Sequence, residues 1–131
     1  MMVSTKGRYG LRALLVLALY YEKGPVSMNV ITEHQGLSRK YIHTLLTLLK
    51  NAGIVNCSRG VKGGYFLASP PNEITLYDII KALEGDVSFI GSSEYKIDCS
   101  LTKECRIKEV WKELDSQLIE MFKKVTLVDY F

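Results

Sequence analysis

The chain is poor in several residue types that common protein classes require. It has 3 cysteines, 2 histidines, 3 prolines and 1 tryptophan among its 131 residues. Three cysteines cannot form a fully paired disulfide framework, so we expect them to be thiols, sensors or metal ligands. Neither histidine lies near a plausible nucleophile, and the acidic residues are scattered over amphipathic segments, which gives no acid/base or hydrolytic constellation. The sequence therefore predicts that the protein is not an enzyme.

Long hydrophobic runs are also missing. The longest run, Ala13 to Leu19, is far shorter than the roughly 20 residues needed to cross a bilayer. The N-terminus lacks the pattern of a cleavable signal peptide. We therefore expect a cytoplasmic protein with no membrane partner. Its length suits one compact domain with an attached element.

What the sequence does contain is the pattern of a helix-turn-helix. Ser27 can cap a short helix that ends at Gly36, and Ser38 can cap a second helix over residues 38–50. One face of helix 38–50 is basic and hydroxylated, as a DNA-reading helix requires. Its other face carries apolar residues at helical spacing, namely Ile42, Leu45, Leu46 and Leu49.

The segment that follows this helix predicts a β-hairpin wing. Two short strands are expected over Ile54–Cys57 and Tyr65–Leu67, joined by the glycine-rich, basic tip 58–64. A glycine-rich loop can also hold phosphate in a P-loop, but there a Gly-Lys pair and a Ser or Thr open a helix. Here Gly64 runs into a strand, so the hairpin is the better interpretation.

The remainder of the chain predicts two flanking helices, a loop and a long last helix. We expect helices at about 5–21 and 76–83, and an aperiodic loop from residue 86. The long helix, about 103–124, carries a heptad seam with spacings of four and three. Its seam residues are Ile107, Trp111, Leu114, Leu118, Met121 and Val125.

This seam has two interpretations. A long apolar helix can dock on its own domain, or it can pair with a second subunit. The domain already has its own helices, so we expect a homodimer. The predicted fold is mainly α with a β wing: a winged helix-turn-helix domain (1–85), a sensor or cluster-type loop (86–102), and a dimerisation helix with the C-terminal tail (103–131).

Charge is strongly segregated along the chain. Residues 1–65 contain nine Lys or Arg and two Glu, a net charge of +7, whereas residues 66–131 contain eight basic and twelve acidic residues, a net charge of −4. Positive charge concentrated on the helix-turn-helix is what neutralising DNA phosphates requires. We therefore expect double-stranded DNA as the partner, read by a dimer on a palindromic operator.

Several motifs together carry a family resemblance. They are STKGRYGLRAL (4–14), GPVS (24–27), LSRKYIHTLL (37–46), NAGIV (51–55), RGVKGGYFLA (59–68) and ITLYDIIKALEG (74–85). In this order they resemble the Rrf-two family of bacterial transcription regulators, which includes IscR-, NsrR- and CymR-type members. The resemblance implies a dimeric winged-helix regulator, which we expect to act as a repressor.

The resemblance also implies which of the DNA-binding residues contact phosphate and which contact the bases. We expect Ser38, Arg39, Lys40 and Tyr41, at the N-terminus of the recognition helix, to hold phosphate. His43 and Thr44 are better placed for base edges, although His43 can equally be a solvated helix residue. In the wing, Arg59 is expected to enter the minor groove, with Lys62 and Gly63 beside it.

The sensing site is where the sequence departs from cluster-binding members of the family. Those members resemble one another in three cysteines, each separated from the next by five residues. Cys99 and Cys105 match the second and third, but the first position is Ser93. Another branch resembles these in binding a [2Fe-2S] cluster, but with two cysteines plus a carboxylate and a histidine from the partner's first helix, where this chain has Arg8 and Arg12. A [2Fe-2S] cluster is therefore possible only with an incomplete or unusual ligand set.

Two other modes of control remain open. Cys99 and Cys105 can form a redox pair, because the neighbouring Lys103 and Arg106 would favour a thiolate, or they can be relics without a function. A CymR-like regulator can also be controlled by docking a metabolic enzyme. Cys57, at the base of the wing, is expected to be a small strand residue whose modification would disturb DNA contact.

A spectrum would separate a cluster from the other modes. We expect protein purified without oxygen to be colourless and free of iron, and still to bind DNA, because the ligand set is incomplete. The measurement is the visible absorption with iron and sulfide content, beside the Cys99→Ala/Cys105→Ala double variant. Visible bands with stoichiometric iron that vanish in the double variant would contradict this expectation.

Overall fold

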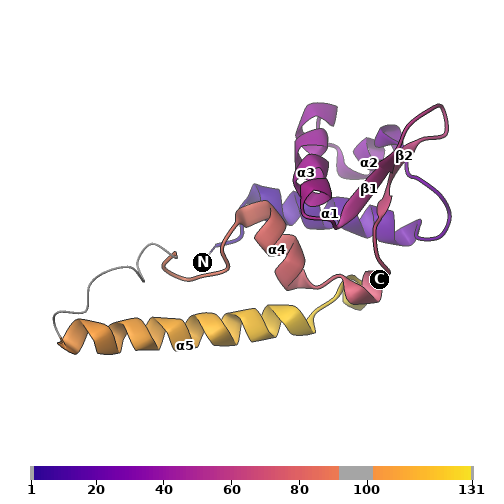
Figure 1. Cartoon of the computed structure of the whole chain (residues 1–131). Helices are drawn as coiled ribbons and strands as arrows, with labels where there is room; N and C mark the ends of the chain where they lie inside the picture. Colours follow the sequence, from indigo (N-terminus) through magenta and orange to yellow (C-terminus); the bar gives the residue numbers. More distant parts are fainter. Residues whose placement is uncertain (1, 92–101, 131) are drawn as a thin grey trace.

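The computed structural model describes residues 2–91 and 102–130. Its elements are α1 (Thr5–Leu19), α2 (Met28–Gln35), α3 (Arg39–Asn51), β1 (Val55–Ser58), β2 (Gly64–Leu67), the 3-10 turn η1 (Pro71–Glu73), α4 (Leu76–Glu84), α5 (Thr102–Lys124) and the 3-10 turn η3 (Leu127–Tyr130). Figure 1 shows α1 to α4 and the two strands gathered into one body, with α5 extending beside it as a long rod. The mainly α, winged helix-turn-helix prediction is confirmed. None of the helices in the described ranges is long and apolar enough to span a membrane.

The helix-turn-helix forms where its capping residues place it. The Ser27 hydroxyl accepts a hydrogen bond from Val30 N at 3.3 Å, and the Ser38 hydroxyl accepts one from Tyr41 N at 3.2 Å. Gly36, with φ +63°, takes the left-handed conformation that ends α2. The recognition helix therefore covers Arg39–Asn51, with Ser38 as its cap, which shifts the predicted range 38–50 by one residue.

The core forms around the apolar face of α3. Ile42, Leu45, Leu46 and Leu49 are all completely buried. They belong to one cluster with residues from the other elements of the body, among them Leu14 and Leu17 of α1, Ile31 of α2, Val55 of β1 and Ile79 of α4. Because this face of α3 is buried, its basic and hydroxylated face is directed outward.

The wing is held against the helical body through its second strand. β1 and β2 pair antiparallel, with Val55 opposite Leu67 and Ser58 opposite Gly64. Val26, which precedes α2, exchanges two backbone hydrogen bonds with Tyr65, both at 2.8 Å. A Cβ atom on Gly64 would lie 2.2 Å from the Val26 carbonyl oxygen, so only glycine permits this approach.

The end of the chain returns to the DNA-binding body. Leu127 is completely buried, and its N–H donates to the Ile74 carbonyl oxygen at 3.1 Å. Val125 follows the last residue of α5, and its carbonyl oxygen accepts from Leu76 N at 2.8 Å. The seam prediction placed Val125 on the helix, but the segment has already turned toward α4 there.

Replacing Gly64 tests how the wing is held. We expect Gly64→Ala to lower the free energy of unfolding by about 1–3 kcal/mol, because the new methyl group would collide with the backbone of Val26. The measurement is urea denaturation at fixed protein concentration. Ser58→Ala, on the exposed cross-strand partner, should stay within about 0.5 kcal/mol of the wild type. Equal losses in the two variants would contradict this account.

Candidate nucleic-acid interface

The N-terminal end of α3 is exposed and basic. Arg39 and Lys40 both lie on the surface directly after the Ser38 cap. Arg39 Nη1 donates a hydrogen bond to Asn29 Oδ1, which ties the guanidinium group to α2. Free backbone N–H groups at a helix N-terminus, next to cations, are a common binding place for phosphate.

An aromatic pair joins this end of α3 to α1. Tyr41 is half-buried, and its ring meets that of Tyr9 edge to face, with centroids 6.3 Å apart. The guanidinium carbon of Arg12 lies 5.2 Å from the centroid of the Tyr9 ring. The i, i+3 spacing of Tyr9 and Arg12 on α1 is visible in the sequence, but it gives no sign of their place beside the recognition helix. The structure adds Arg12 to the positive charge at this end of α3.

The outward face of α3 presents two threonine hydroxyl groups and the side chain of His43. The Thr44 hydroxyl donates to the Lys40 carbonyl oxygen at 3.0 Å, and the Thr47 hydroxyl donates to the His43 carbonyl oxygen at 2.8 Å. Because each hydroxyl proton is already engaged, each oxygen faces solvent as an acceptor. His43 is exposed, and its imidazole can offer a donor and an acceptor to a base edge.

The tip of the wing is a tight, exposed turn. Gly63 N donates to the Gly60 carbonyl oxygen at 3.0 Å. A Cβ atom on Gly63 would lie 2.2 Å from the Ser58 carbonyl oxygen, so the predicted wing residue Gly63 serves the turn itself. Arg59 and Lys62 are both exposed beside it. The structure thus places two cations at the end of the hairpin.

One side-chain contact links the recognition helix to the wing. Lys50, in the last turn of α3, places its Nζ atom 3.2 Å from the Sγ atom of Cys57 on β1. Cys57 is exposed. The sequence placed Cys57 at the base of the wing, as observed, but the seven-residue separation gave no sign of the contact with Lys50.

The residues predicted for sensing lie outside the described part of the chain or at its edge. Cys99 lies outside the described residues, and Cys105 falls in the first turn of α5. Arg8 and Arg12 are exposed on α1, where they offer no metal ligand. Among the residues that the structure describes, no group of three or more His, Cys, Asp or Glu could hold a metal ion.

One face of α5 exposes large apolar side chains. Ile107, Leu114 and Met121 of the predicted seam are exposed, and Val110, which the seam omitted, is 57% exposed. Trp111 and Leu118 are only half-buried, at the border of this face. The heptad pattern indicated the stripe but not its centre, because it could not show which side of the helix meets α4.

The side of α5 next to Trp111 holds the segment that leads out of α4. Asp115 is only 7% exposed, and its two carboxylate oxygens accept from the Ser88 hydroxyl at 2.6 Å and from Phe89 N at 2.8 Å. These bonds fix residues 88–89, the start of the predicted sensor loop, to the middle of α5. No sequence pattern pointed to Asp115, since its partners lie 26 and 27 residues away.

Comparison with known proteins agrees with this architecture. The Rrf2 family profile, described as an iron-dependent transcriptional regulator, matches residues 3–131. The chain is 41% identical to the HTH-type transcriptional regulator CymR of Bacillus subtilis, over 92% of this chain and 88% of CymR. It is 33% identical to the HTH-type transcriptional regulator IscR of Vibrio vulnificus strain YJ016, over 97% of this chain and 75% of IscR.

Solved structures show the same relationship. The structure of CymR from B. subtilis matches with a TM-score of 0.79 at 36% identity, covering 98% of this chain and 95% of that one. The T. potens IscR structure matches with a TM-score of 0.73 at 40% identity, covering 98% and 85%. These relatives are transcriptional regulators rather than enzymes, as predicted. The chain belongs to the Rrf2 family and is a DNA-binding transcriptional regulator with a winged helix-turn-helix fold.

Proposed function

We propose that the protein is a dimeric repressor that reads a palindromic operator with α3 and the wing. The observation that carries this proposal is the two-sided character of α3. Its apolar face is completely buried, and its exposed face presents His43, Thr44, Thr47 and Lys50. A helix presented in this way fits the major groove, where base edges can be distinguished by donors and acceptors.

Phosphate contacts would position the helix before any base is read. Arg39, held by Asn29, and Lys40 flank the open N-terminus of α3. Beside them are the Ser38 cap and the Tyr41 ring, which contacts Tyr9 of α1. Such contacts supply affinity that depends on salt and hardly on sequence. His43, with its unobstructed ring, and Thr44, as an acceptor, are then the proposed base readers.

The wing would add a second, narrower contact. Arg59 and Lys62 extend from the tight turn closed by Gly60 and Gly63. An arginine side chain is favoured in a narrow minor groove, where the negative potential is strongest. We propose that Arg59 enters that groove and that Lys62 holds the adjacent phosphate.

Dimerisation would proceed through the exposed face of α5. Ile107, Val110, Leu114 and Met121 follow one side of the helix, and all four are exposed in the single chain. Two such helices packed against each other would bury these side chains and place two copies of α3 about one helical turn of DNA apart. Repression then follows from occupancy, because a dimer on the operator excludes other proteins from the same DNA.

The signal that controls binding stays a prediction. Because Ser93 takes the place of the first cysteine, and Arg8 and Arg12 offer no metal ligand, we propose no step through iron. A thiol pair of Cys99 and Cys105 and the docking of a metabolic enzyme remain the alternative signals stated above. CymR of B. subtilis is described as a global cysteine regulator.

Salt dependence tests the phosphate contacts. We expect Lys40→Ala to weaken binding to all sequences similarly and to reduce the slope of log K against log salt by about one unit per subunit. His43→Ala should instead alter the preferred base at one position of each half-site. The measurement is fluorescence anisotropy with duplexes selected from a random library.

Lys123→Ala is the matched control for Lys40→Ala. Lys123 lies over the Tyr77 ring, 5.1 Å from its centroid, on α5 rather than at the proposed interface. The slope of log K against log salt for Lys123→Ala should equal that of the wild type. If Lys40→Ala left the slope unchanged, the N-terminus of α3 would not be a phosphate site.

Charge on the apolar face of α5 tests the dimer. We expect Leu114→Glu/Met121→Glu to be monomeric by light scattering, because two buried carboxylates would face their symmetry copies. Its operator affinity should fall steeply, because the two heads would bind independently. Ser116→Glu adds a charge to the same helix away from this face and should remain a dimer. A dimeric double variant would refute the proposed interface.

A further inference from the structure

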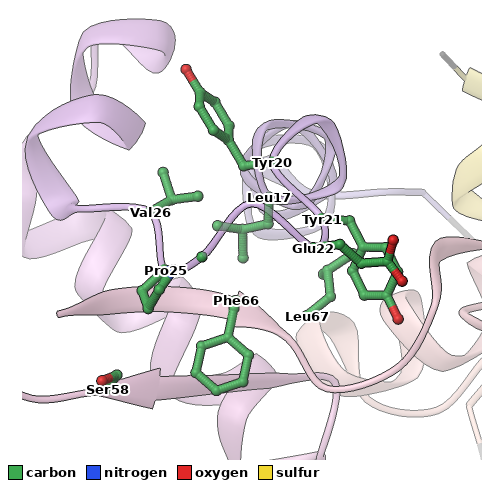
Figure 2. Close-up of a pocket in the computed structure, with 10 residues that line it drawn as sticks. Leu17, Tyr20, Tyr21, Glu22, Pro25, Val26, Ser58, Phe66 and Leu67 are labelled. Atoms are coloured by element: carbon green, nitrogen blue, oxygen red, sulfur yellow. The ribbon is translucent and has the colours of Figure 1, made fainter. Parts of the chain in front are cut away.

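A cavity lies where the connection between α1 and α2 meets the wing. Its volume is about 430 Å³, within the range of small-molecule sites. Figure 2 shows that the lining comes from separate parts of the chain: Leu17 of α1, the connection after α1 (Tyr20, Tyr21, Glu22, Gly24, Pro25 and Val26), Ser58 of β1, and Phe66 and Leu67 of β2. The cavity therefore has walls on both the helical body and the wing.

The lining is mostly apolar and aromatic. In Figure 2 the Phe66 ring extends from β2, and Leu17 lies between it and Tyr20. Tyr20, which also lines the cavity, is 38% exposed. Apolar walls that include aromatic residues favour a ligand with an apolar body.

Glu22 is a charged residue in this otherwise largely apolar lining. The Glu22 side chain is exposed, and the described residues give it neither a hydrogen bond nor an ion pair. Its φ of +65° is the only positive value at a described residue other than glycine. That conformation is unfavourable for a residue with a Cβ atom. Strained residues of this kind gather at ligand sites, because binding can offset their cost.

The wing and the connection are joined at the edge of the same cavity. Val26, which lines it, exchanges both of its backbone hydrogen bonds with Tyr65 of β2. A molecule that touches Phe66 on one side and Tyr20 on the other would favour one position of the wing relative to α1. Ligands shift such equilibria by their differential contacts with the two arrangements.

We propose that this cavity binds a small molecule with an apolar, ring-containing body and one protonated amine, and that its occupancy changes DNA affinity through the wing. The apolar walls take the body, and the Glu22 carboxylate, assisted by the aromatic faces, takes the ammonium group. The regulatory half of the proposal rests on the proposed use of the wing in DNA binding.

Three probes with one ring system and different end groups test the site. Tryptamine carries an ammonium group, tryptophol a hydroxyl group and indole-3-acetate a carboxylate. We expect tryptamine to shift the amide NMR signals of the lining residues, and to bind about fivefold or more tightly than indole-3-acetate. Glu22→Gln should remove that preference without weakening tryptophol.

Glu73→Gln is the matched control, because it removes an exposed carboxylate that does not line this cavity. It should keep the preference for tryptamine. The site would be overturned if none of the three probes bound, or if the NMR shifts occurred at residues outside the cavity. It would also be overturned if Glu22→Gln kept the full preference for tryptamine.

DNA affinity measured with and without tryptamine tests the coupling. Tryptamine at a concentration that just saturates the wild type should change its DNA affinity by about fivefold or more, and should change that of Glu22→Gln less, because the variant binds tryptamine more weakly. Binding of tryptamine with no change in DNA affinity would overturn the coupling. The affinity without tryptamine tests the proposed function separately, because it involves no ligand.

Discussion

The buried face of α3 is the constraint on which the DNA-reading surface depends. Leu45, Leu46 and Leu49 have no exposed surface, and burying a leucine side chain stabilises a fold by about 1.5–3 kcal/mol. This packing fixes the rotation of the helix about its own axis. The polar residues between the buried ones are thereby directed outward together, and contacts such as Arg39 with Asn29 and Lys50 with Cys57 add to a rotation that the core already sets.

Local patterns were sufficient to predict the helix-turn-helix and the wing. Caps such as Ser27 and Ser38 act within three residues of their position, so the sequence shows them directly. The α5 stripe was predicted less well. Periodicity reveals that a helix is two-sided, but only packing decides which side is covered, so Val110 was omitted and Val125 was placed on a helix that had already ended.

Contacts between distant segments had no local signal. Glu84 Oε1 accepts from Ser4 N at 2.8 Å, Ser4 Oγ at 2.6 Å and Gly7 N at 3.0 Å, which joins α4 to the first turn of α1. The partners are 77 and 80 residues apart. The hydrogen bonds of Asp115 and the lining of the cavity beside the wing likewise join residues that are distant in the sequence and adjacent only in the folded protein. The contacts that join distant segments are therefore those that the sequence shows least.

The return of the chain after α5 has a geometric consequence. Leu127 is sealed in the core beside Ile74, while the 23-residue α5, about 34 Å long, leads away from it. The helix is thus held to the DNA-binding body at its C-terminal end, and Asp115 holds its middle to the segment that follows α4. In the proposed dimer, these two attachments together would set the orientation of each head relative to the two-fold axis, so the spacing of operator half-sites would be fixed by contacts outside the recognition surface.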